Sequence, residues 1–167
     1  MRVTSMSLPA GFAIVVITVV VMEGVATAVH KYVMHGWGWG WHRSHHEPHE
    51  GALERNDLYA LVFAALSLGL IWQGARLWTA LIFVGWGMAA YGLLYCIVHD
   101  GLVHQRWPFR RAPQSGYLKR LVQAHRLHHA SERREHCVSF GFLYAPPIPR
   151  LKDQMRGRGT QTRQAKP

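Results

Sequence analysis

The sequence has only two cysteines and few acidic residues. Neither Cys96 nor Cys137 belongs to a CxxC motif, which excludes a disulfide scaffold and a thiolate zinc or iron–sulfur site. Charged residues make up 17% of the chain, whereas an average soluble domain has about 25%. Because the missing charge falls in long apolar stretches, the sequence predicts neither a disordered chain nor an ordinary water-soluble domain.

Three long apolar runs predict membrane-spanning helices. They cover Leu8–Val29, Leu58–Gly74 and Leu77–Val98. At roughly 1.5 Å per residue, the first run is long enough for a bilayer core of about 30 Å. A signal peptide is the alternative for this run, but its apolar core would usually have only about 7–15 residues. We expect the other two runs to form a hairpin that turns near Gly74, with Gly85 and Gly87 allowing close helix packing.

The residues from Cys137 onward are not predicted to span the membrane. Cys137–Pro149 is a candidate fourth span, but its roughly 13 residues are too few, so we expect an interfacial or docked segment. The basic tail, residues 150–167, shows no periodicity, and we expect it to be disordered and to contact anionic lipid. The predicted fold class is therefore all-α: an integral membrane bundle of three, or at most four, transmembrane helices in residues 1–149, with cytoplasmic helices carrying the histidines.

The order of the spans places all 12 histidines on one side of the membrane. Residues 106–167 carry 14 Lys and Arg against 3 Asp and Glu, whereas the other side has only Arg2 and Arg76. The positive-inside rule then makes the histidine side cytoplasmic and puts the N-terminus outside. The same rule accounts for the basic charge, so we expect no nucleic-acid partner.

Ten of the histidines form two similar arrays, each with an HxxxxH motif followed by an HRxHH motif. The first array is His30, His35, His42, His45 and His46, and the second is His99, His104, His125, His128 and His129. The histidines of HRxHH lie on one helical face, where two can chelate one metal ion and the third can reach a neighbouring ion. In an α-helix the rings of HxxxxH would lie about 140° apart, which suits ligands from two sides of a helix end. His49 and His136 lie outside these motifs, and we assign them no metal role.

A histidine-rich site beside a bilayer, without thiolates, suits a dinuclear non-haem iron centre that uses O₂ on an apolar substrate. A zinc hydrolase would typically need three protein ligands and a water, and a transporter would hold its ligands within the spans. Glu23 is the only acid inside the predicted spans, and Asp100 adjoins His99. Both are candidate hydrogen-bond partners of ligand histidines, with a packing hydrogen bond as the alternative for Glu23.

Three stretches of the sequence resemble motifs of the bacterial β-carotene hydroxylases, which belong to the wider fatty acid hydroxylase superfamily of membrane di-iron oxygenases. They are HKYVMHGWGWGWHRSHHEP (His30–Pro48), HDGLVHQRWPFR (His99–Arg110) and CVSFGFLYAPP (Cys137–Pro147). The resemblance implies that the ten histidines of the arrays bind two iron ions, and it implies no catalytic residue beyond this metal centre. It also implies that O₂ and two electrons hydroxylate C3 of the β-ionone ring, converting β-carotene to β-cryptoxanthin and then zeaxanthin, or canthaxanthin to astaxanthin. The electrons would come from reduced ferredoxin and an NAD(P)H-dependent reductase.

Several alternatives stay open on the sequence alone. The chain can instead be a carotenoid ketolase, a lipid hydroxylase or desaturase of the same superfamily, or a non-enzymatic membrane metal-binding protein. The basic face would attract an acidic ferredoxin or anionic lipid. Trp37, Trp39 and Trp41 would help to admit the substrate ring or form an interfacial aromatic belt.

Overall fold

The computed structural model describes residues 6–164, apart from residues 48–50, 52, 109–110 and 132–133. Its helices are α1 (Leu8–Ala28), η1 (Val29–Trp37), α2 (Trp39–His46), α3 (Asp57–Gly74), α4 (Ala80–Tyr95), η2 (Cys96–Val103), α5 (Gly116–His129) and α6 (Ile148–Gln164). Every regular element in this part of the chain is a helix, which confirms the all-α prediction. The elements η1 and η2 are wider π-helical turns that continue α1 and α4 without a break.

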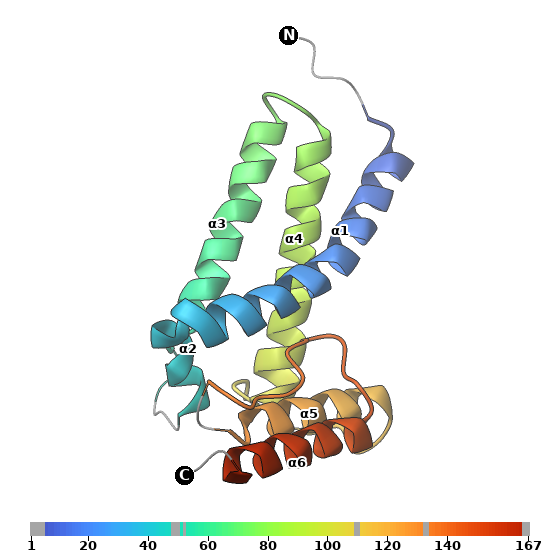
Figure 1. Ribbon diagram of the computed structural model, residues 1–167. Helices are drawn as coiled ribbons and strands as arrows, with labels where there is room; N and C mark the ends of the chain where they lie inside the picture. The colour runs from blue at the N-terminus through green and yellow to red at the C-terminus, as the bar shows by residue number, and fades with distance from the viewer. Residues whose placement is uncertain (1–5, 48–50, 52, 109–110, 132–133, 165–167) are drawn as a thin grey trace.

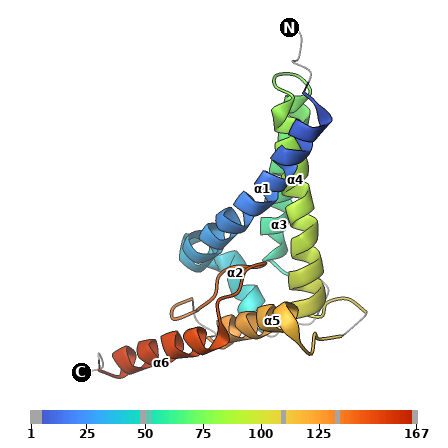
Figure 2. The same ribbon diagram turned by 90° about the vertical axis from the view of Figure 1, so that its right-hand side faces the viewer.

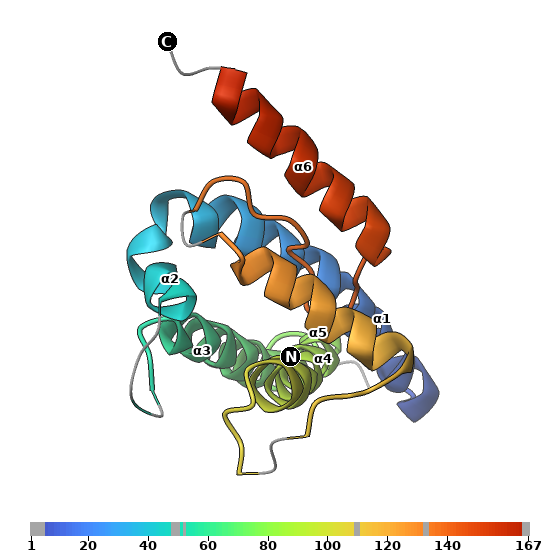
Figure 3. The ribbon, with the colours of Figure 1, turned by 90° about the horizontal axis from the view of Figure 1, so that it is seen from below.

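Three helical stretches of the described chain are long and apolar enough to cross a membrane. They are Leu8–Trp37, Asp57–Gly74 and Ala80–Val103. Helices α3 and α4 form the predicted hairpin, and α1 packs against α4 before it diverges toward the other end of the bundle (Figures 1 and 2). At that end α5 lies across the ends of the spans, as the view from below shows (Figure 3). The three predicted spans are therefore confirmed, and the π-helical turns extend the first and third of them.

Glycines on α4 allow close approach to both neighbouring helices, as predicted. A Cβ at Gly85 would lie 2.7 Å from the backbone oxygen of Ser67 on α3, and the Ser67 hydroxyl donates a 2.7 Å hydrogen bond to the Gly85 carbonyl. A Cβ at Gly87 would lie 2.5 Å from Cβ of Thr18 on α1. Because lipid provides little hydrophobic drive for helix association, such close backbone packing is what holds membrane helices together.

Replacing Gly87 by leucine is expected to destabilise the bundle by about 1–3 kcal/mol, because overpacking forces α1 and α4 apart. The matched control is Gly92→Leu on the same helix, where an added Cβ meets no atom within 4 Å. Thermal unfolding in detergent, followed by circular dichroism, measures both variants. Equal loss of stability in the two would contradict the close contact of α1 with Gly87.

The tail differs from the prediction of disorder, because α6 is a helix that begins before residue 150. Leu151 is only 1% exposed and belongs to a buried cluster with Leu121 and Ala124 of α5. Ile148 and Met155 pack against the same cluster, so α6 buries a helical stripe of spacing three and four. A boundary between residues 149 and 150 therefore cuts through a helix.

The segment from Cys137 to Pro147 connects α5 to α6 without forming a helix. Here it is called the cover segment. Val138, Phe142 and Ala145 are buried, and the backbone carbonyls of Val138 and Phe140 accept hydrogen bonds from histidine side chains. The expectation of a docked segment in place of a fourth span is therefore confirmed.

Candidate metal centre

All ten histidines of the two arrays gather where the spans meet α2 and α5. Within the described part of the chain, nine of them form two groups whose ligand atoms lie within 4.8 Å of one another. The first cluster is His30, His35, His42, His46 and His128, and the second cluster is His45, His99, His104 and His125. The tenth, His129, adjoins the second cluster, with its Nε2 atom 2.8 Å from that of His125. Its ring also stacks on His46 at 4.4 Å between ring centroids, so it lies between the clusters.

The two clusters do not follow the two sequence arrays. His45 leaves the first array for the second cluster, and His128 leaves the second array for the first cluster. The helical spacing explains this exchange. In each HRxHH motif the residues at i and i+4 meet through their Nε2 atoms, at 3.3 Å for His42 and His46, while the residue at i+3 turns to the other cluster. The motif is therefore divided between two clusters, in the way that the helical spacing allows.

The prediction that HxxxxH separates its two rings is wrong. His30 and His35 lie 5.1 Å apart between ring centroids, and His99 and His104 lie 4.5 Å apart. The cause is the π-helical form of η1 and η2, whose i→i+5 hydrogen bonds bring residues five apart onto one face. The backbone N–H of His104, for example, donates to the carbonyl of His99 at 2.9 Å.

In the first cluster, every histidine has an Nδ1–H group that donates to a neutral oxygen. The acceptors are the carbonyls of Phe140 (2.9 Å from His30), Arg134 (2.9 Å from His35), Ser131 (3.2 Å from His46) and Val138 (2.9 Å from His128), and Oδ1 of Asn56 (2.7 Å from His42). Such bonds fix the orientation and the tautomer of a ligand imidazole. Two of the four carbonyls belong to the cover segment, which gives this otherwise unassigned motif a place in the site.

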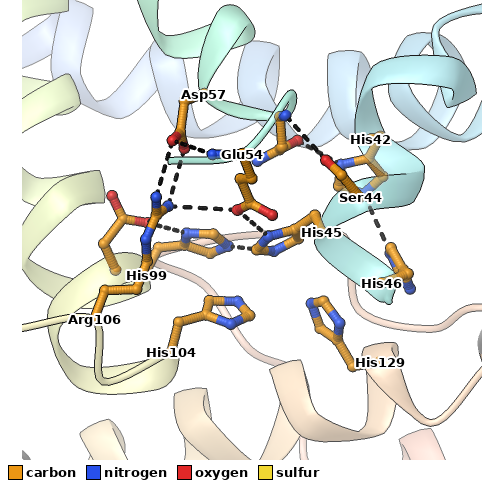
Figure 4. A network of polar contacts seen from close by, with 12 residues as sticks. His42, Ser44, His45, His46, Glu54, Asp57, His99, His104, Arg106 and His129 are labelled. Atoms are coloured by element: carbon orange, nitrogen blue, oxygen red, sulfur yellow. Dashed lines mark hydrogen bonds and ion pairs between the residues drawn. The ribbon is translucent and has the colours of Figure 1, made fainter. Parts of the chain in front are cut away.

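For two histidines of the second cluster, the acceptors are carboxylates. The Nδ1–H group of His45 donates to Oε1 of Glu54 at 2.8 Å, and that of His99 donates to Oδ1 of Asp100 at 2.8 Å. In Figure 4 the rings of His45 and His99 face each other, and their Nε2 atoms are 3.1 Å apart. Asp100 therefore contacts a candidate ligand as predicted.

Arg106 joins these carboxylates into one network. Its guanidinium donates two 2.9 Å hydrogen bonds to the carboxylate of Asp57 and a 3.4 Å bond to Oε1 of Glu54 (Figure 4). The side chain of Glu54 is 1% exposed, so the partly buried guanidinium supplies the opposite charge that a buried carboxylate needs. The network therefore fixes Glu54 behind the ring of His45.

The remaining nitrogens indicate what the clusters can hold. Where Nδ1 carries the proton, Nε2 presents a lone pair, and in the first cluster these lone pairs face one another. The Nε2 atoms of His30 and His42 are 3.1 Å apart, as are those of His35 and His128. Lone pairs at this distance repel unless a cation lies between them. The donor set therefore fits metal ions that neutral imidazole binds, iron among them.

Burial keeps these imidazoles neutral. It lowers the pKa of His42 to about 3 and the pKa of His46 to about 4, despite the hydrogen bond from each ring to an oxygen acceptor. Burial also lowers the pKa of His125 and His128, and neighbouring histidines lower it further. Neutral imidazole is the form that a metal ion requires.

The metal-free protein is expected to lose stability as the pH falls below the ordinary histidine value of about 6.5. The unfolded chain takes up protons there, whereas buried His42 and His46 stay neutral until about pH 3 and 4. The contribution of His42 and His46 to the free energy of unfolding is thus complete above about pH 6.5, and it decreases as the pH falls toward their folded pKa values. Melting temperatures of chelator-treated protein at about pH 7.5 and about pH 5 measure this. Equal values would contradict neutral burial.

Glu23 has a different role from the one predicted for a partner of a ligand histidine. Its carboxylate accepts hydrogen bonds from the backbone N–H groups of residues 142–144, at 3.0 to 3.1 Å, and from the hydroxyl of Tyr91 at 2.8 Å. These bonds correspond to the packing alternative. They also act on the site, because Phe142 stacks on His30 at 4.9 Å between ring centroids. Glu23 thus fastens the cover segment over the first cluster.

The remaining aromatic and histidine candidates differ in whether they contact the clusters. Trp39 contacts the rings of His35 and His46, each at 5.3 Å between centroids, whereas Trp37 is 87% exposed. Trp41 is also exposed. His136 is exposed and belongs to neither cluster, and His49 lies outside the described residues.

The sequence interpretation missed Glu54, Asn56 and Arg106. A usable signal existed for Glu54, because the chain has only nine acidic residues and this one lies between a histidine motif and a span. Nothing in a sequence marks the backbone carbonyls that orient the first cluster.

Comparison with known proteins decides the family. The sequence profile of the fatty acid hydroxylase family matches residues 15–146, which include every histidine of both clusters. The chain belongs to the fatty acid hydroxylase family. This family membership confirms the resemblance and the prediction of a membrane hydroxylase.

Individual members of the hydroxylase family are similar over most of the chain. The β-carotene hydroxylase of Pantoea ananas is 63% identical over 145 residues, which cover 87% of this chain and 83% of that protein. The β-carotene hydroxylase of Paracoccus sp. (strain PC1) is 60% identical over 149 residues, covering 89% and 92%. A chloroplastic β-carotene 3-hydroxylase of Arabidopsis thaliana is 37% identical over 139 residues, which cover 81% of this chain and 45% of the plant protein. No solved structure matches the chain.

Proposed function

We propose that this hydroxylase acts on the β-rings of carotenoids and adds a hydroxyl group at C3. β-Carotene would give β-cryptoxanthin and then zeaxanthin, and canthaxanthin would give astaxanthin. The names and the 57–63% identity of the bacterial relatives support the substrate class, and the names of the plant relatives support the position. The observation that carries the proposal is the pair of histidine clusters, with facing Nε2 lone pairs, at the end of three membrane-compatible helices.

The nine histidines of the two clusters and His129 would hold two iron ions, which supply the activation of O₂ when bound. One oxygen atom would enter the substrate and the other would leave as water, with two electrons and two protons supplied from outside. The chain's own part is to hold the imidazoles neutral and oriented, through the acceptors of their Nδ1–H groups, and to exclude water. Buried His30 and His128, both 0% exposed, show how dry these positions are.

The surroundings of the clusters suggest how substrate and electrons arrive. A carotenoid dissolves in the bilayer, and α2 and α5, which carry histidines of both clusters, lie where the membrane-compatible helices end (Figure 1). Reduced ferredoxin, served by an NAD(P)H-dependent reductase, would bind to the basic side of the protein. By the positive-inside rule, that side faces the cytoplasm and the start of α1 lies outside. The membrane would then be the cytoplasmic membrane.

Expression in a bacterium that accumulates β-carotene tests the proposal. Chromatography and mass spectrometry should detect β-cryptoxanthin and zeaxanthin, and the same bacterial strain without the chain is the control. Keto products would assign the chain to the ketolases. Unchanged β-carotene, with iron-loaded protein present in the membrane, would overturn the carotenoid assignment.

A further inference from the structure

The two histidine clusters differ in the charge that lies behind their rings. In the first cluster all five Nδ1–H groups donate to uncharged oxygens, four from the backbone and one from the Asn56 amide. In the second cluster the Nδ1–H groups of His45 and His99 donate to the carboxylates of Glu54 and Asp100. The acceptors of these seven rings are thus neutral in the first cluster and anionic in the second.

The anionic side carries an excess of negative charge. Glu54, Asp57 and Asp100 surround one guanidinium, that of Arg106, at 2.9 to 3.7 Å between nitrogen and oxygen. Arg106 donates its two 2.9 Å bonds to Asp57, whereas its nitrogen lies 3.4 Å from Oε1 of Glu54 and 3.7 Å from Oδ1 of Asp100. Arg106 therefore compensates the carboxylates beside His45 and His99 less than it compensates Asp57, and their negative charge acts on the imidazoles. A carboxylate at Nδ1–H makes an imidazole a stronger electron donor at Nε2.

From this difference we propose that the two metal positions are inequivalent, with the second cluster favouring the ferric ion and the first cluster the ferrous ion. The inference rests on the proposed function, because it requires iron in both clusters. Its physical basis is that negative charge near an ion stabilises the higher oxidation state more than the lower one. Glu54 and Asp100 are then positioning residues that set the order in which the two ions lose electrons.

Redox titration of the full chain, purified in detergent and loaded with ⁵⁷Fe, tests the proposal. Mössbauer spectra count ferrous and ferric ions at each potential and do not depend on turnover. The wild type should lose its two electrons in separate steps. Glu54→Gln keeps an oxygen for His45 but removes the charge. It should therefore raise the reduction potential of only one step, the one in which the second cluster is oxidised. We expect the preference of that position for ferric iron to fall about 10-fold or more.

The matched variant is Asn56→Asp, which places a carboxylate behind His42 of the first cluster. It should lower the reduction potential of only the other step, in which the first cluster is oxidised. Asp100→Asn repeats the Glu54→Gln expectation at His99, and circular dichroism checks that each variant folds. Equivalent ions in the wild type, equal shifts of both steps, or a shift of the wrong step would overturn the inference while leaving the proposed function intact. A wild-type chain that binds no iron would overturn both.

Discussion

Replacing His128 by alanine is expected to abolish hydroxylation and to leave one metal ion bound per chain instead of two. The side chain is 0% exposed, and its Nε2 atom lies 3.1 Å from that of His35, so alanine removes one of the five nitrogen donors that the first cluster offers. Loss of a group that only orients a ligand costs about 10–100-fold, and loss of the ligand itself should exceed this. Product analysis measures the activity, and elemental analysis of the purified protein counts the metal ions.

The matched control for this prediction is His136→Asn. His136 is exposed, and asparagine tolerates its left-handed backbone, which has a φ of 71°. This variant should keep both metal ions and full activity. If His128→Ala kept most of the wild-type activity, the assignment of that histidine as a ligand would be wrong.

Combining substitutions tests which cluster His128 belongs to. The sequence arrays group it with His125, whereas the structure places it with His35. The double variant of His128 and His35 should therefore still bind one ion, like each single variant. The double variant of His128 and His125 should bind none. The opposite pattern would show that the arrays, and not the exchanged clusters, describe the metal sites.

The spans were predictable because their signal is summed over many residues. Leu8, Gly74 and Val98 mark boundaries that the structure places within a few residues, and the packing glycines Gly85 and Gly87 were identified from their location alone. Helix α6 was not predicted, because a basic composition hid the three apolar residues that dock it on α5. Only the partner surface of α5 makes that stripe meaningful, and the sequence does not show which surface will be near.

The histidines of the site were predictable, but their arrangement was only partly so. The i, i+3, i+4 geometry of HRxHH follows from the α-helix and was correct. The HxxxxH motif was misjudged because a π-helical turn depends on the surrounding packing and has no reliable local signature. His30 and His35 share a face only in that form. The roles of Glu54 and Asn56 required the fold, since nothing local pairs them with His45 and His42.

Replacing Glu23 by alanine is expected to loosen the cover segment and to weaken metal binding in the first cluster. Three backbone N–H groups of residues 142–144 would lose their acceptor. Each buried donor left unsatisfied costs about 1–3 kcal/mol. Because the carbonyl of Phe140 accepts the hydrogen bond of His30 at 2.9 Å, a displaced segment would no longer orient that ligand. We expect activity to fall about 10–100-fold, as for other partners of ligand histidines.

Hydrogen exchange measured by mass spectrometry separates this role of Glu23 from a general loss of stability. Amides of residues 142–144 should exchange faster in Glu23→Ala, while those of α3 should not change, because the hydrogen bonds of Glu23 come from residues 142–144 and from Tyr91 of α4. Tyr91→Phe is the matched control, because it removes one hydrogen bond to the carboxylate but leaves all three backbone bonds in place. It should keep the slow exchange and the metal. Fast exchange in Tyr91→Phe, or unchanged exchange in Glu23→Ala, would show that the cover segment is held over His30 by its apolar contacts and not by the buried carboxylate.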